Sequence, residues 1–221
     1  MSMLDGTRIV DELRRNILTG ALAGGAPLRQ EHLARTLGVS RIPVRDALSL
    51  LQREGLVVVA PHEGASVAPM SLASATEAFE MRLALEPLAL RASIDELSNA
   101  DLGAAEDALT RLRAATGDYD LAQANWLFHS SLYGKAKRPL LLATLDAVHQ
   151  NASRYQIMGA STRLRFEQSE HEHQALLSAC RARDVCGAVD VLERHLRAAS
   201  EVLLAHLQSI SDPSGSLAWP S

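Results

Sequence analysis

Three histidines and one asparagine stand at spacings that would let them bind one metal ion. Asn125 and His129 are four residues apart, so they share one face of a helix. His173 and His195 each stand eleven residues from Asp184, where two helical segments are separated. Eleven residues make nearly three helical turns and a rise of about 16 Å, so the two imidazoles meet at one level of an antiparallel hairpin. Three imidazoles and a side-chain oxygen suit zinc, nickel or a similar divalent ion.

Helical periodicity in the second part of the chain would position these four residues. Strand signals are absent after Ser71, and apolar residues recur at helical spacing. The segments with this pattern are 72–97, 101–115, 119–136, 140–158, 163–181 and 185–207. The short breaks between them predict an all-helical antiparallel bundle of about six helices over residues 70–210. Pro87 should kink or split the first helix, and residues 211–221 should form a disordered tail.

Residues 1–69 carry a different pattern. The expected helices are 4–18, 30–37 and 41–54, and the expected strands are 56–59 and 65–67. Gly38 stands where a helix end favours a left-handed residue, and Ser40 can cap the helix that follows. Two helices joined by a tight turn and followed by a hairpin describe a winged helix-turn-helix. The fold class is therefore mainly α, with this module at the N-terminus and the helical bundle at the C-terminus.

The start of the third helix carries side chains suited to reading DNA. Arg41 and Arg45 share a helix face that excludes the apolar residues Val44 and Leu48. A recognition helix enters the major groove with its N-terminal end forward, and arginine there can bind guanine O6 and N7. Ser40 and the helix N-terminus can hold a phosphate. Two arginines at this spacing are often only a solvated face, but the flanking turn and hairpin favour contact with DNA.

The stretch Gly38-Val39-Ser40-Arg41-Ile42-Pro43-Val44-Arg45-Asp46-Ala47-Leu48 resembles the start of the recognition helix in the GntR superfamily of regulators. The similarity continues through residues 50–57 and Gly64. It implies that Ser40, Arg41 and Arg45 contact DNA. It also implies that the wing approaches the minor groove around His62 and Gly64, although for His62 alone a structural role is equally favoured. Ile42 stands where the family usually has threonine.

The helical half resembles the FCD effector domain of FadR-type GntR regulators. The matching motifs are Asn125-x-x-x-His129, the run from His173 to Ala179, His195, and Arg82-Leu83-Ala84-Leu85-Glu86. The resemblance implies that a metal bound by Asn125, His129, His173 and His195 lies in a pocket for small carboxylic acids. It also implies a homodimer. Asn125 replaces the usual aspartate and is the weaker ligand. Arg82 either binds the acid or forms a salt bridge with Glu86.

Composition argues against other classes of protein, whereas charge adds little to the case for DNA, which depends on where the arginines stand. The net charge is -4, but residues 1–69 hold 8 arginines against 7 acidic residues. Neither a signal peptide nor a membrane-length apolar run is present, so we expect a cytoplasmic protein without membrane partners. A metal-dependent hydrolase would need a general base beside the metal, and no His-Glu-x-x-His unit exists.

We therefore predict a DNA-binding transcriptional regulator and no enzyme. Its operator affinity would depend on a small carboxylic acid bound at a metal-containing pocket. We expect the protein to bind a palindromic operator as a homodimer and to act as a repressor. A regulator that senses the metal ion directly remains the alternative.

Overall fold

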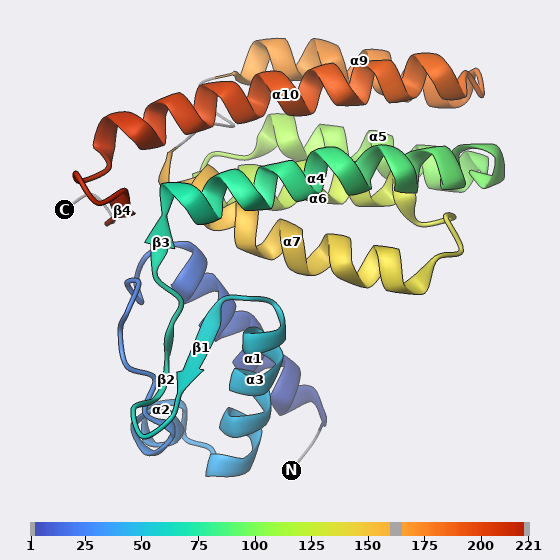
Figure 1. The fold of residues 1–221 in the computed structure, drawn as a ribbon. Helices are drawn as coiled ribbons and strands as arrows, with labels where there is room; N and C mark the ends of the chain where they lie inside the picture. Colours follow the sequence, from blue (N-terminus) through green and yellow to red (C-terminus); the bar gives the residue numbers. More distant parts are fainter. Residues whose placement is uncertain (1–2, 160–164, 219–221) are drawn as a thin grey trace.

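The computed structural model describes residues 3–159 and 165–218, and it begins with a winged helix-turn-helix (Figure 1). Helices α1 (Met3–Leu18), α2 (Gln30–Leu37) and α3 (Arg41–Arg53) precede the strands β1 (Val57–Ala60) and β2 (Gly64–Val67). Gly38 ends α2 in the left-handed conformation, with φ 65°, as its position after the last apolar residue predicts. Val44, Leu48 and Leu51 of α3 are buried against apolar residues of α1. This packing fixes α3 and leaves its arginine-bearing face in solvent.

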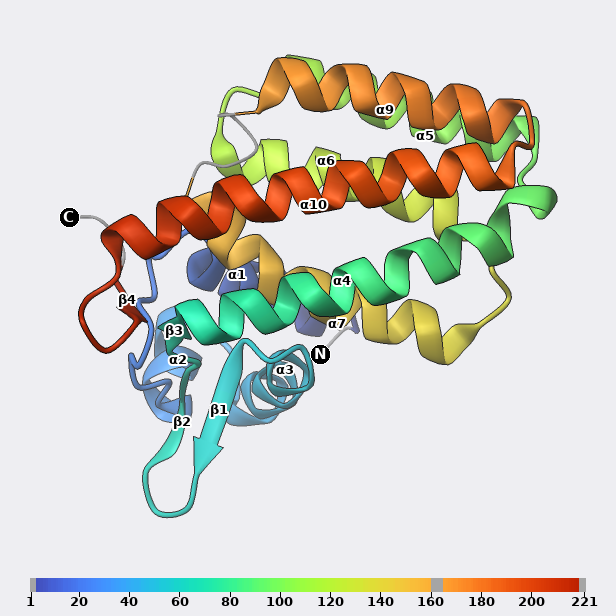
Figure 2. The same cartoon turned by 45° about the horizontal axis from the view of Figure 1, so that its top comes forward.

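Strands β1 and β2 form the predicted hairpin, which projects from the module as the wing (Figure 2). Val57 pairs with Val67 and Ala60 pairs with Gly64. His62 and Gly64 both have positive φ, 69° and 82°. This left-handed backbone closes the turn and is easy for glycine but uncommon for histidine.

The helical domain follows as a bundle of long helices. They are α4 (Leu72–Ser93), α5 (Asn99–Ala114), α6 (Asp118–Tyr133), α7 (Pro139–Met158), α9 (Phe166–Arg181) and α10 (Val185–Ile210). A 3₁₀ turn, η1 (Ile94–Glu96), extends α4. Helix α4 lies against α7 and α10, and α5 lies against α6 and α9. The mainly helical fold class is thus confirmed, and within the described residues no helix is long and apolar enough to cross a membrane.

Two local expectations need correction. Pro87 was expected to kink or split the first helix of the bundle, and the split is wrong, since α4 runs continuously from Leu72 to Ser93. The tail is not disordered over residues 211–218. Strand β4 (Ser216–Leu217) pairs with β3 (Met70–Ser71), which leads into α4. Leu217 is 6% exposed, so burial of one apolar side chain and the strand pairing hold the tail against the start of α4. The expected start of the fifth helix at 163 lies outside the described residues.

Candidate metal centre and DNA-reading surface

The three imidazoles predicted to converge do so inside the helical domain. One ring nitrogen from each of His129, His173 and His195 lies within 4.8 Å of the other two. The ring centroids are 4.7–5.2 Å apart, and the side chains are 0%, 1% and 5% exposed, respectively. Helix α6 supplies His129, whereas α9 and α10 supply the other two from their antiparallel pair. We call this group the histidine cluster.

The chemistry of the histidine cluster fits a divalent metal. His129 Nε2 and both ring nitrogens of His173 are buried and have no hydrogen-bond partner in the described part of the chain. Buried polar atoms are normally paired, so orphaned nitrogens that face one another indicate a missing partner. Zinc lies about 2.0–2.1 Å from each imidazole nitrogen, which sets the nitrogens about 3.4 Å apart. Only a small approach of the side chains is needed for one ion.

Glu172 orients the ring of His195 by a hydrogen bond to its Nδ1 atom. Its Oε2 lies 2.7 Å from His195 Nδ1, and Arg165 Nη2 donates to its Oε1 over 3.0 Å. Burial acts to raise the pKa of Glu172, but hydrogen bonds from His195 and Gln168 and the charge of Arg165 outweigh it and lower the pKa to about 2. The carboxylate therefore stays ionised and accepts a hydrogen bond from Nδ1–H of His195. That leaves Nε2 as the nitrogen that could bind a metal.

A second hydrogen-bonded chain orients His129. Its Nδ1 lies 3.3 Å from the hydroxyl of Tyr133, and that hydroxyl donates to Glu86 Oε2 over 2.7 Å. Burial, followed by the charge of Glu86, raises the pKa of Tyr133 well above 10, so the hydroxyl remains a donor. Arg82 Nε donates to Glu86 Oε1 over 2.5 Å. His129 Nε2 is thereby left free for a metal, and the centre is linked to α4.

The buried salt bridge between Arg82 and Glu86 leaves part of the Arg82 guanidinium group without a hydrogen-bond acceptor. Arg82 Nη1 has no hydrogen-bond partner among the described residues, although the side chain is only 2% exposed. Arg82 lines a cavity of about 20 Å³ beside His195. The full lining consists of Arg82, Asn125, Gln156, Arg165, Ser169, His195 and Ala199. Both readings of Arg82 from the sequence therefore remain compatible with its position, and Asn125 lies next to the histidine cluster.

Several residues around the centre were not predicted from the sequence. Tyr133 follows His129 by four residues, so helical spacing could have placed it beside that ring. Glu170 and Glu172 stand two residues apart on α9, and only Glu172 bonds to the cluster, whereas Glu170 pairs with Arg113. Arg165 and Gln156 carry no local signal, and only the packing of separate helices brings them to the cavity.

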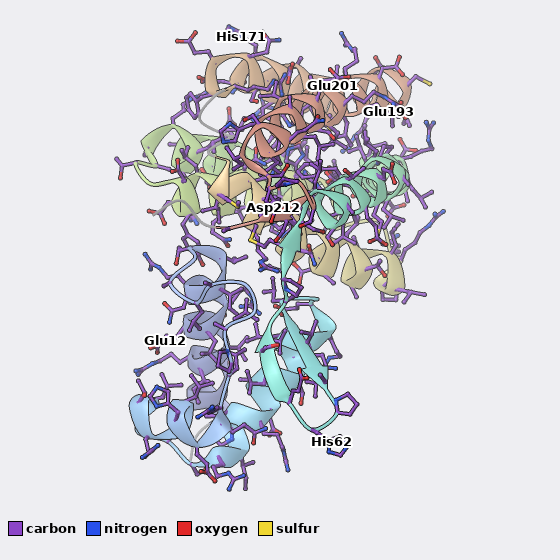
Figure 3. The ribbon with its side chains drawn as sticks, turned by 60° about the vertical axis from the view of Figure 1, so that its left-hand side comes forward. Glu12, His62, His171, Glu193, Glu201 and Asp212 are labelled. Carbon is purple, nitrogen blue, oxygen red and sulfur yellow. The ribbon has the colours of Figure 1, made fainter. Side chains whose placement is uncertain are left out.

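The remaining histidines divide between surface and core. His171 is exposed on the outer side of α9, as its spacing from His173 predicts (Figure 3). His149 is buried, stacked on Trp126 with ring centroids 4.0 Å apart, and bonded through Nε2 to Ser153 Oγ. It lies outside the histidine cluster and contributes to packing.

These buried rings predict a loss of stability in mild acid. Burial lowers the pKa of His129, His149 and His173 well below 6.5. Because the unfolded chain then binds more protons than the native one, the free energy of unfolding falls as pH drops below about 6.5. The slope is up to about 1.4 kcal/mol per pH unit for each such histidine. Urea unfolding of chelator-treated protein at several pH values measures this slope.

A matched pair of variants separates the buried from the exposed rings. His149→Phe should reduce the pH dependence of the unfolding free energy in acid by about the contribution of one buried histidine. His171→Gln should leave that slope unchanged, because its ring is exposed on α9. An unchanged slope in His149→Phe would contradict the prediction.

The side chains predicted to contact DNA lie together in the winged helix-turn-helix, at the end of the molecule opposite the histidine cluster. Ser40, Arg41 and Arg45 are exposed at the start of α3. Ser40 makes no capping bond with its side chain, so the hydroxyl and the helix N-terminus are both available. Arg41 pairs with Glu31 at 3.0 Å and Arg45 with Asp46 at 3.4 Å, with both guanidiniums mostly in solvent. Exposed pairs of this kind are weak and can exchange for phosphate or base.

A groove of about 610 Å³ connects this helix to the wing. It is lined by residues of the turn before α2, of α2, of the start of α3 and of the wing: Pro27, Leu28, Arg29, Gln30, Glu31, His32, Arg35, Arg41, Glu63, Gly64 and Ala65. His62 is exposed at the tip of the hairpin (Figure 3). Ile42 is 62% exposed beside Arg41, so an apolar side chain faces the solvent where the related proteins usually have threonine.

A winged helix-turn-helix joined to an all-helical domain with a buried histidine cluster defines a class of transcriptional regulators. Residues 6–67 match the model of the gntR family of bacterial regulatory proteins, and residues 77–198 match the FCD domain. The chain therefore belongs to the GntR family and has the FadR-type architecture with an FCD domain.

Individual relatives agree with this assignment. A Streptomyces ambofaciens protein described as an uncharacterized HTH-type transcriptional regulator is 33% identical over 190 residues, or 85% of this chain and 80% of the relative. The regulator McbR of Escherichia coli K12 is 26% identical over 80% of this chain and 82% of its own. A GntR-family structure from Pseudomonas syringae has 34% identity and a TM-score of 0.58, covering 93% and 87% of the two chains. The E. coli McbR/YncC structure, at 24% identity and a TM-score of 0.74 over 93% and 99%, shares the fold.

Proposed function

We propose that this regulator binds DNA under the control of a small carboxylic acid, which it takes up at a divalent metal in the helical domain. The observation that carries the proposal is the histidine cluster, in which buried, unpartnered imidazole nitrogens face one another. His129, His173 and His195 would hold zinc or nickel, with Asn125 as a weaker fourth ligand. A divalent ion with an open coordination position attracts carboxylates. Arg82 lines the cavity beside His195, and its unpartnered Nη1 would bind the acid as well.

The proposed DNA contacts divide by groove. Arg41 and Arg45 would enter the major groove with the start of α3, and Ser40 would bind a phosphate. His62 and Gly64 at the wing would lie near the minor groove. All five residues are exposed, and they belong to the winged helix-turn-helix, which lies below the helical bundle in Figure 1. DNA can therefore bind without blocking access to the helical domain.

Arg45→Ala should abolish specific operator binding and leave the fold intact. Arg45 is exposed and makes only a weak pair with Asp46, so its removal leaves no buried group unpaired. Loss of one bidentate contact to guanine should cost about 1–3 kcal/mol of binding free energy. Gel-shift titration at fixed salt measures the effect. Arg53→Ala, at the far end of α3, is the control, and unchanged affinity in Arg45→Ala would contradict the assignment.

The coupling between the two halves would run through the junction that follows residue 69, which we propose as the domain boundary. Two helices of the effector domain contact this junction. Helix α4 begins directly after it, and α7 bonds to it through Arg154 Nη2, which donates to the carbonyl of Ala68 over 2.6 Å. Asn151 Nδ2 donates to the carbonyl of Gly55 at the end of α3. A homodimer on a palindromic operator would convert movement of the junction into a change in half-site spacing.

The alternative function is direct sensing of the metal ion. The size of the cavity beside His195, about 20 Å³, favours this alternative, because it holds little more than a water molecule. Fluorescence anisotropy of a labelled operator separates the two functions. The protein is compared after treatment with chelator, after loading with zinc, and after addition of acetate, lactate or succinate.

The two functions give different outcomes in this experiment. An acid that changes operator affinity only in the metal-loaded protein supports the proposal. A change caused by zinc alone, with no further effect of any acid, supports metal sensing. An operator affinity that responds to neither contradicts both.

A further inference from the structure

Buried polar atoms without partners gather around one cavity. Within the described residues they include Arg82 Nη1, Gln156 Oε1 and Arg165 Nη1, and all three side chains line the cavity beside His195. Such atoms are rare in folded proteins, because each one loses its hydration without gaining a hydrogen bond. Two of the three belong to guanidinium groups, and their presence at one place indicates an occupant that can accept hydrogen bonds from both.

The two arginines reach this cavity from separate helices. Arg82 belongs to α4, and Arg165 stands immediately before α9. Each is already neutralised through another nitrogen, Arg82 by Glu86 at 2.5 Å and Arg165 by Glu172 at 3.0 Å. Each still offers its unpartnered Nη1, whose N–H groups can only donate. The occupant must therefore supply an acceptor to each of two guanidinium groups.

The charges around the cavity specify how many negative groups that occupant carries. The pairs Arg82–Glu86 and Arg165–Glu172 are each neutral, and imidazoles that bind a metal are neutral. A divalent ion at the histidine cluster therefore leaves two positive charges in a buried site. Burying net charge is costly. A ligand with two carboxylates would cancel the charge, whereas a monocarboxylate would leave one unit uncompensated.

We propose that the effector is a short dicarboxylic acid. One carboxylate binds at the metal and Arg82, and Arg165 binds the second. This inference rests on the proposed function and names the ligand class of the same site. The cavity of about 20 Å³ is smaller than such an acid, so binding must move its walls apart. Gln156 on α7 is one of those walls, two residues from Arg154, which holds the junction. Binding of the acid would thus displace the helix that contacts the linker.

Calorimetric titration of zinc-loaded protein with succinate and with butyrate tests the proposal. The two acids share a four-carbon chain and differ in the second carboxylate. Succinate should bind about 10- to 100-fold more tightly, the value of a charge-assisted hydrogen bond to a buried guanidinium. Arg165→Gln should abolish the preference for succinate over butyrate, and its zinc content is measured beside the titration, because Arg165 also bonds to Glu172 behind His195. Arg181→Gln is the matched control, an exposed arginine at the end of the same helix.

Each outcome decides between the inference and the function on which it rests. Equal affinities for the two acids in the wild-type protein would overturn the dicarboxylate class, while the proposed function would stand. A full preference for succinate in Arg165→Gln would overturn the role of Arg165. Failure of both acids to bind the zinc-loaded wild-type protein would overturn the proposed function itself. The comparison of acids in the wild-type protein does not depend on how any variant folds.

Discussion

Replacement of His129, His173 or His195 by glutamine should strip the purified protein of its metal. The wild-type protein should hold about one divalent ion per chain after dialysis, because three buried imidazoles can bind it from three helices at once. Glutamine is close in size but is a poor ligand for zinc. With only two imidazoles left, the ion should be lost on dialysis. Elemental analysis of protein prepared without affinity tags or chelators measures the content.

His171→Gln is the control for this experiment. It removes a histidine from the same helix as His173, but from its exposed side. Its metal content should equal that of the wild-type protein. Asn125→Asp extends the test in the other direction, because a carboxylate is a stronger ligand than an amide and should slow metal loss to a chelator. A wild-type protein that takes up no zinc or nickel would contradict the assignment of the centre.

Replacement of Arg154 by methionine should uncouple the effector from DNA binding. Arg154 is 1% exposed, and its guanidinium bonds to the carbonyl of Ala68 in the linker while Nε lacks a partner in the described chain. Burial lowers its pKa. Methionine fills similar volume without the charge, so the fold should persist. Effectors typically change affinity about 5- to 150-fold, and this factor should fall close to one in the variant.

The measurement is operator affinity with and without effector, together with effector affinity with and without operator. The change in operator affinity caused by the effector and the change in effector affinity caused by the operator must fall by the same factor, because coupling between two binding sites is reciprocal. Arg183→Met is the matched control. Arg183 also donates to backbone carbonyls, those of Ile94 and Leu97, but at the end of the bundle away from the linker. A variant Arg154→Met that retains the full effector response would show that the coupling runs elsewhere.

The spacing of residue types along the sequence predicts much of the local structure of this protein. The left-handed Gly38, the hairpin around Gly64 and the solvent-facing arginines of α3 all follow from residue type and helical or strand period. The meeting of His173 and His195 follows in the same way, since equal distances from a break bring two helical positions to one level. These features depend on contacts within one element or between neighbours in the chain, which a sequence pattern records.

Long-range packing decided the rest. Leu217 returns to β3 and orders the tail, although nothing near Leu217 in the sequence indicates a strand partner. Glu86 reaches the centre from α4, which is distant in sequence from His129, and Tyr133 becomes part of it only because Glu86 lies beside its hydroxyl. Pro87 is held within α4 because the helix is buried along its length against its neighbours. Such outcomes depend on which surfaces the whole chain buries together. The free energy gained by that burial exceeds the local preferences from which a sequence is interpreted.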